Sequence, residues 1–169
     1  MNQLSLKILG EIVPEKTLQA LYNEWNPIIT VDRTIRPSYP DLVREVKYPE
    51  LELAGPAKFD VRKIKTFLHY KQMDCSATGN KIHEELLAKK LLEDCLGLAD
   101  LWAIRARGIG FFQKYFAGKA IFGWKSVVMG CDGGFYVPYL CDEGDEVKLR
   151  WRWLCDNFYF NNHALYFAS

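Results

Sequence analysis

The strongest constraint on the fold is a short run near the C-terminal end of the sequence, in which hydrophobic and basic side chains alternate without a break. The hydrophobic members are Val147, Leu149, Trp151 and Trp153, and the basic members between them are Lys148, Arg150 and Arg152. Successive side chains of a β-strand point to opposite faces of its sheet. The run therefore predicts a strand whose tryptophans face a core while its cations face outward.

Strand-like patterns also surround this run. We expect strands over residues 120–129, 135–141, 147–154 and 165–167, with turns at residues 131–134 and 143–145. Both turns are rich in Asp and Gly, as hairpin turns are. The C-terminal third, about 118–169, is thus predicted to be an antiparallel β-meander.

The preceding residues favour helices. Helical spacing of apolar residues covers residues 14–25, 60–68, 81–96 and 98–116. Gly108 and Gly110 weaken the last run and allow either a kink or the close approach of another backbone. Residues 1–13 read as a short strand or an arm. Residues 36–57 hold four prolines and predict an irregular segment with one short helix at 41–46. That segment wraps a core, joins two lobes or serves as a partner-binding arm.

These patterns together predict one α+β domain over residues 1–169. Its helical part, about 1–117, would pack on the C-terminal antiparallel meander.

Composition narrows the function classes. The 169 residues carry 22 Lys+Arg against 21 Asp+Glu, a net charge of +1, which argues against a domain built to coat phosphate backbones. We see no secretory signal and no apolar run of membrane-spanning length, so we expect a cytoplasmic protein without a membrane partner. Five irregularly spaced cysteines and three scattered histidines suggest neither a disulfide framework nor zinc. We therefore expect no metal and no cofactor.

One surface of the predicted meander is a candidate binding site. Pairing the strands around residues 143–145 places Lys148 opposite Tyr139, Arg150 opposite Val137 and Arg152 opposite Phe135. A face carrying Lys148, Arg150, Arg152, Phe135 and Tyr139 could bind single-stranded nucleic acid, with aromatic rings stacking on bases and cations meeting phosphates. The same alternation is also typical of an ordinary solvent-exposed sheet face. Four nearby acids, at positions 142, 143, 145 and 146, would reduce the attraction for phosphate.

A second candidate surface is the aromatic run Phe158, Tyr159 and Phe160, which lies in a predicted loop. Exposed aromatic side chains are typical of the centres of protein interfaces. The run is either a contact for a protein partner or a second copy, or it is buried against the helices.

The sequence offers little catalytic chemistry. It lacks a phosphate-binding glycine loop and a nucleophile elbow. A Cys–His nucleophile could be drawn from Cys75 with His69 or His83, but histidines at helix ends are more often structural. We therefore assign no catalytic residue.

Several segments resemble a family of uncharacterised bacterial proteins. They are residues 36–41 (RPSYPD), 49–52 (PELE), 55–57 (GPA), 118–128 (GKAIFGWKSVV), 136–141 (YVPYLC) and 164–169 (ALYFAS). The resemblance covers most of the chain after residue 33. It implies a bacterial, intracellular origin and brings no activity, cofactor or site residue with it.

The leading hypothesis is a non-enzymatic binding module whose partner is a protein or a second copy of the chain. Single-stranded nucleic-acid binding through the basic–aromatic face is one alternative. A small enzyme with a cleft between helices and sheet is the other.

Overall fold

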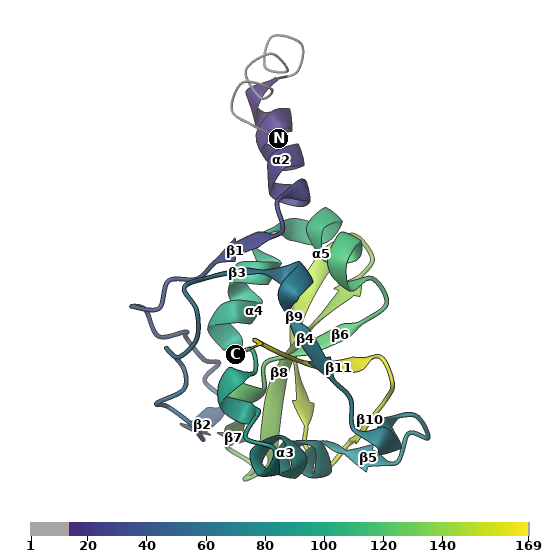
Figure 1. Ribbon diagram of the computed structural model, residues 1–169. Coiled ribbons are helices and arrows are strands. Elements are labelled where there is room, and N and C mark those ends of the chain that lie inside the picture. Colours follow the sequence, from purple (N-terminus) through teal and green to yellow (C-terminus); the bar gives the residue numbers. More distant parts are fainter. Residues whose placement is uncertain (1–13, 169) are drawn as a thin grey trace.

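The computed structural model describes residues 14–168 (Figure 1). Its α-helices are α2 (Glu15–Trp25), α3 (Gly79–Ala88), α4 (Leu98–Arg105) and α5 (Gly108–Phe116). Its strands are β1 (Ile28–Thr30), β2 (Val43–Val46), β3 (Lys58–Asp60), β4 (Lys65–Phe67), β5 (Ala77–Thr78), β6 (Ala120–Phe122), β7 (Val128–Gly130), β8 (Phe135–Glu143), β9 (Glu146–Trp153), β10 (Asn157–Phe158) and β11 (Asn162–Tyr166). Four 3-10 turns, η1 (Val61–Lys63), η2 (Tyr70–Gln72), η3 (Leu92–Asp94) and η4 (Trp124–Ser126), connect them.

A seven-stranded sheet organises the molecule. Its order is β2-β7-β8-β6-β11-β4, and β9 pairs with β8. Both β6 and β7 pair with β8, and the turn η4 separates them along the chain. The sheet therefore forks at η4, with β2 continuing one branch and β11 and β4 the other.

Hydrophobic cores cover both faces of this sheet. One core gathers side chains of α4 and α5, such as Ile104 and Phe111, against Leu140 of β8. The other gathers Ile82 of α3 and Phe158 around Val137 of the same strand. The β8 residues alternate between the two cores, as the pleat of a strand requires.

The α+β class expected from the sequence is confirmed, but the arrangement within it is not. Strands occur before residue 118, where β1 pairs with β3 and where β2 and β4 join the main sheet. The last strand, β11, runs parallel to β6 and antiparallel to β4. The sheet is therefore mixed, because β11 inserts between an early and a late strand where a meander would place it at an edge.

The N-terminal helix over 14–25 is confirmed as α2, which projects from one end of the molecule (Figure 1). The helix expected over 60–68 is instead the single turn η1, capped by Asp60, followed by β4. The run over 98–116 breaks into α4 and α5 at Gly108, whose φ of +82° lies in the left-handed region. The helix expected at 41–46 is wrong, because these residues include β2. The arm expected over 1–13 lies outside the described residues.

The hairpin of β8 and β9 is confirmed, with a register two residues away from the expected one. Tyr139 pairs with Arg150, and Leu140 pairs with Leu149. The turn is tighter than expected because Gly144, at φ +68°, allows a two-residue connection between Glu143 and Glu146. A shift of two residues leaves each side chain on its expected face.

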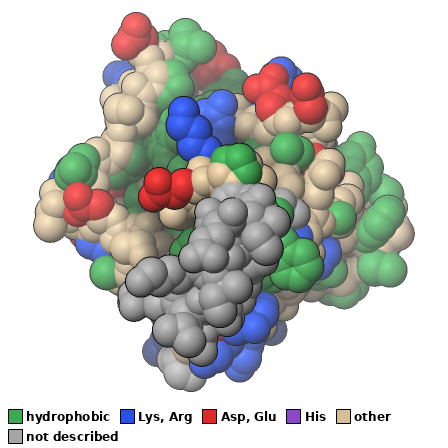
Figure 2. All heavy atoms as spheres, turned by 90° about the horizontal axis from the view of Figure 1, so that it is seen from above, with side chains coloured by type: hydrophobic (Ala, Val, Ile, Leu, Met, Phe, Trp, Pro, Cys, Tyr) green, Lys and Arg blue, Asp and Glu red, His purple; other side chains and the backbone are tan. Residues whose placement is uncertain are grey.

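The described helices include none of a length and apolarity that would cross a bilayer. Figure 2 looks onto the end from which α2 projects and shows exposed hydrophobic side chains lying between groups of basic and acidic ones.

Candidate functional site

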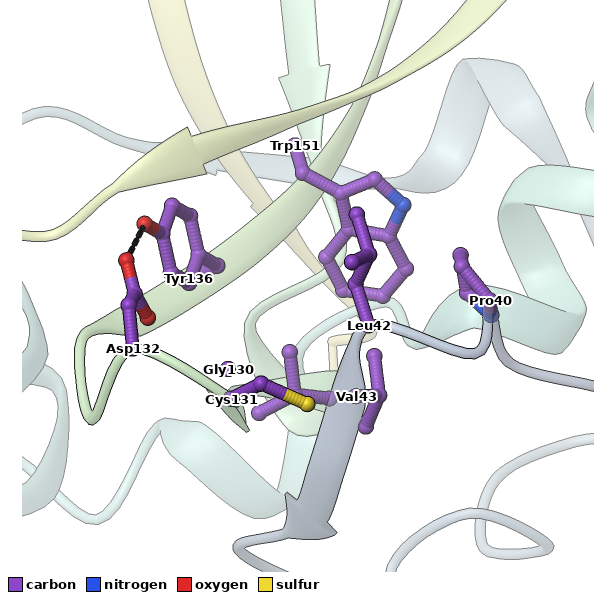
Figure 3. A pocket seen from close by; sticks show the side chains of 9 residues that line it. Pro40, Leu42, Val43, Gly130, Cys131, Asp132, Tyr136 and Trp151 are labelled. Atoms are coloured by element: carbon purple, nitrogen blue, oxygen red, sulfur yellow. Dashed lines mark hydrogen bonds between the residues drawn. The ribbon is translucent and has the colours of Figure 1, made fainter.

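An open hydrophobic cavity, which we call the Leu42 groove, lies where the proline-rich segment meets the sheet (Figure 3). Its volume is about 370 Å³. It is lined by Pro40, Leu42, Val43, Val128, Gly130, Cys131, Asp132, Tyr136 and Trp151. Ligand sites typically have volumes of roughly 300–1,000 Å³, so the groove is large enough for a hydrophobic side chain or a small molecule.

The walls of the groove come from segments distant in sequence. Leu42 directly precedes β2, whose first residue, Val43, pairs with Gly130 of β7. Trp151 reaches the groove from β9, and its ring centroid lies 6.0 Å from that of Tyr39. The groove therefore forms only when the proline-rich segment lies on the sheet.

Leu42 stands at the groove with 75% of its surface exposed. Burying a leucine side chain contributes roughly 1.5–3 kcal/mol, and this contribution is still available to a partner. The Cys131 thiol is also exposed here.

A polar pair closes one end of the groove. The Tyr136 hydroxyl donates to Asp132 Oδ2 at 2.6 Å, and the backbone N–H of Gly134 donates to Asp132 Oδ1 at 3.0 Å. The bond from Tyr136 lowers the pKa of Asp132, and the same bond raises the pKa of Tyr136. At neutral pH this end presents a carboxylate and a protonated phenol, which suits hydrogen bonding to a ligand and offers no base poised near pH 7.

The cations of the expected nucleic-acid surface are already engaged. Arg150 donates to both carboxylate oxygens of Glu143, at 2.7 and 2.6 Å, and Lys148 lies 2.9 Å from Glu146. Arg152 donates to a backbone oxygen at the start of β10, at 2.7 Å. Two acids at the hairpin turn thus pair with Lys148 and Arg150, while Arg152 is bound to a backbone oxygen.

The aromatic members of that surface are also partly covered. Tyr139 is half-buried and stacks on Phe122 with ring centroids 4.9 Å apart. Phe135 is more exposed and lies under the ammonium of Lys47, 4.6 Å from its ring centroid. The face was expected to be open to solvent, but the second core covers much of it because α3 and Phe158 pack there.

The tryptophan face is also less enclosed than expected. Trp151 is half-buried and Trp153 is 45% exposed, whereas Leu140 and Val147 are buried. The core formed by α4 and α5 ends before it reaches the tryptophans.

The three aromatic side chains at residues 158–160 differ in how far they are exposed. Phe158 is fully buried in the second core, so its ring is not available to a partner, which corrects its place in the expected interface. Tyr159 and Phe160 are 42% and 61% exposed, and their role as an interface stays a prediction.

The histidines considered for catalysis have structural partners. His83 is buried, and its Nε2 lies 3.0 Å from the Tyr48 hydroxyl. His69 accepts a backbone hydrogen bond from Lys71 and lies 3.2 Å from Glu85. In the part of the chain that the structure describes, no three acidic, His or Cys side chains cluster in a way that could hold a metal ion.

A buried charge cluster lies at the fork of the sheet, beneath the proline-rich segment. Asp100 and Lys125 are both fully buried, and Arg33 forms an ion pair with Asp100. Lys125 Nζ donates to the Ala54 oxygen at 2.7 Å and lies 3.9 Å from Asp100 Oδ2. Burial lowers the pKa of Lys125, against the opposing effect of Asp100. Through the bond from Lys125 to Ala54, the cluster links the proline-rich segment to the sheet. None of these groups lines the Leu42 groove.

Sequence reasoning missed both the groove and this cluster. The available signals were Lys125 within a largely apolar run, and the apolar pair Leu42 and Val43 after Asp41 in the proline-rich segment. Neither pattern is specific without the fold.

No family model, no curated protein and no solved structure matches this chain. The resemblance to uncharacterised bacterial proteins stays a prediction.

Proposed function

We propose that this protein is a non-enzymatic binding module whose Leu42 groove receives a hydrophobic side chain of a protein partner. One observation carries the proposal: an apolar cavity of about 370 Å³ with Leu42, 75% exposed, at its side. Protein interfaces depend on a few hydrophobic or aromatic anchors that fill such pockets.

The surroundings of the groove suit a polypeptide. The strand β2 lies at the end of the sheet order, beside the groove. An edge strand can pair with an extended segment of a partner, while an adjacent pocket takes one of its side chains. The Asp132–Tyr136 pair supplies polar contacts at the rim.

Charge favours a protein over nucleic acid as the partner. Asp132 is the one charged residue among those that line the groove, and it would repel phosphate. The cations on β9 are paired with acids or with a backbone oxygen.

We include a cytoplasmic location in this proposal. The structure has three exposed free thiols, Cys75, Cys131 and Cys155, and a reducing compartment keeps such thiols reduced.

A peptide-display selection on the intact protein tests the proposal. We expect enriched peptides to share a hydrophobic residue and to bind Leu42→Asp at least about tenfold more weakly, because the change replaces about 1.4 kcal/mol or more of apolar burial by a charge. Met73→Asp is the matched control, because Met73 is 73% exposed and lies outside the lining residues.

Sedimentation of the wild type and of both variants should be measured alongside the peptide selection, to detect self-association. Self-association lost only in Leu42→Asp would identify the partner as a second copy of the chain. The groove would be refuted as the binding site if the peptides bound both variants with the same affinity as the wild type and if sedimentation were unchanged in both.

A further inference from the structure

A second cavity, which we call the Phe167 groove, lies away from the Leu42 groove and shares no lining residue with it. Its volume is about 470 Å³. It is lined by Ile28, Pro56, Lys58, Phe59, Asp60, Lys63, Ile64, Phe167 and Ala168. It therefore brings together β1, the β3–η1 segment and the residues after β11.

The apolar part of this groove is aromatic. The rings of Phe59 and Phe167 meet edge to face, with centroids 5.0 Å apart. Phe59 belongs to the first core and Phe167 packs against it, as does Ile64. These side chains are held by packing, so the groove has a preformed floor for a flat or branched apolar group.

The charged part of the groove is basic. The Asp60 carboxylate is taken by Arg62, which donates to it at 2.6 to 3.2 Å. Lys58 and Lys63 are exposed, and neither forms an ion pair with any residue that the structure describes. Among the lining residues, Lys58 and Lys63 against Asp60 give a charge of +1. Arg62, which does not line the groove, offsets the Asp60 carboxylate.

An aromatic floor beside two ammonium groups that form no ion pair selects one ligand chemistry. An organic cation would be repelled by the lysines, and a neutral apolar molecule would leave them unused. An anionic group would meet Lys58 and Lys63 while its apolar body covers the Phe59–Phe167 pair.

We propose that the Phe167 groove binds a small organic acid, an aromatic or branched apolar body that carries one carboxylate. This site is independent of the protein-binding groove, so either proposal can fail alone.

The test uses two probes that share a ring system and differ in charge. Naphthylacetate carries a carboxylate, and naphthylmethylammonium carries an ammonium. We expect naphthylacetate to bind the intact protein and to shift NMR resonances of Phe59, Ile64 and Phe167, and we expect the cation to leave them unshifted.

Paired variants isolate the charge. Lys58→Glu/Lys63→Glu should weaken naphthylacetate binding by at least about tenfold, because two attractive contacts become repulsive. Lys58→Arg/Lys63→Arg should keep affinity within about twofold. A control, Lys71→Glu/Lys81→Glu, makes the same change in net charge at two lysines outside the groove, one half-buried and one exposed, and should leave affinity unchanged.

Three results would overturn the proposal. They are equal binding of both probes, binding of neither, and an equal loss of affinity in the Lys58/Lys63 and Lys71/Lys81 glutamate variants.

Discussion

Replacing Asp100 by asparagine should lower the free energy of unfolding, because it upsets the balance of buried charges at the fork of the sheet. Asp100 is fully buried, and it is the counter-charge for Arg33 and for Lys125. Its carboxylate also accepts a hydrogen bond from the backbone N–H of Gly97 at 2.8 Å, at the start of α4. Asparagine keeps the size of the side chain and one oxygen for that bond. It removes the charge and replaces the oxygen that accepts from Arg33 by an amide nitrogen.

The expected loss follows from the burial of the cations. The side chains of Arg33 and Lys125 are 12% and 1% exposed. Asparagine leaves Arg33 without its ion-pair partner and leaves Lys125 with only the weaker attraction of Glu52. Breaking a buried pair in this way costs about 3–5 kcal/mol. For a domain of this size, that lowers the melting temperature by roughly 6–20 °C.

Urea unfolding of four proteins would measure this: the wild type, Asp100→Asn, Lys125→Met and the double variant. Once the carboxylate is gone, removing the buried ammonium relieves an uncompensated charge. Lys125→Met should therefore cost less in the Asp100→Asn background than in the wild type, with a coupling of about 0.5–3 kcal/mol.

The control is Glu143→Gln, which removes the carboxylate of an exposed pair with Arg150. We expect no resolvable change in its unfolding midpoint, because exposed pairs are screened by water. The reasoning would be refuted if Asp100→Asn lost less than about 1 kcal/mol, or if the two single costs simply added.

Two further predictions concern acid stability and the nucleic-acid alternative. Burial lowers the pKa of His83 to about 4, below the usual value of about 6.5. The unfolded chain therefore binds a proton first, and stability should fall as the pH drops from 6.5 towards 4, by about 3 kcal/mol at pH 4. Urea midpoints across this range should fall less steeply for His83→Asn, and parallel curves would contradict the assignment. In electrophoretic shifts of single-stranded oligonucleotides at two salt concentrations, we expect no binding that depends on Arg150 and Arg152, because both are engaged. Salt-sensitive binding that disappears in Arg150→Ala/Arg152→Ala would instead support the nucleic-acid alternative.

Local patterns predicted the elements whose contacts are local. The hairpin of β8 and β9 follows from its alternation and from the glycine in its turn, and α2 follows from helical spacing. The faces of the hairpin strands were also predictable, because a register error of two residues preserves them.

Contacts between distant segments were not predictable in the same way. Nothing near residues 43–46 in the sequence indicates that they pair with β7, and nothing near residue 165 indicates a parallel partner. The expected solvent face of β8 is covered because Phe158, which follows the hairpin, packs on it. The Leu42 groove requires β2 to be in place, so its residues could not be grouped before the fold was known.

The position of β11 has a consequence for synthesis on the ribosome. This strand forms ladders with β6 and with β4, and β4 is paired with no other strand in the described residues. After β4 has been synthesised, about a hundred further residues must be added before its neighbour β11 is made. This takes roughly 5–20 s at ordinary elongation rates. During that interval the strand edges of the growing chain stay open, and a chaperone that shields them would raise the yield of native protein.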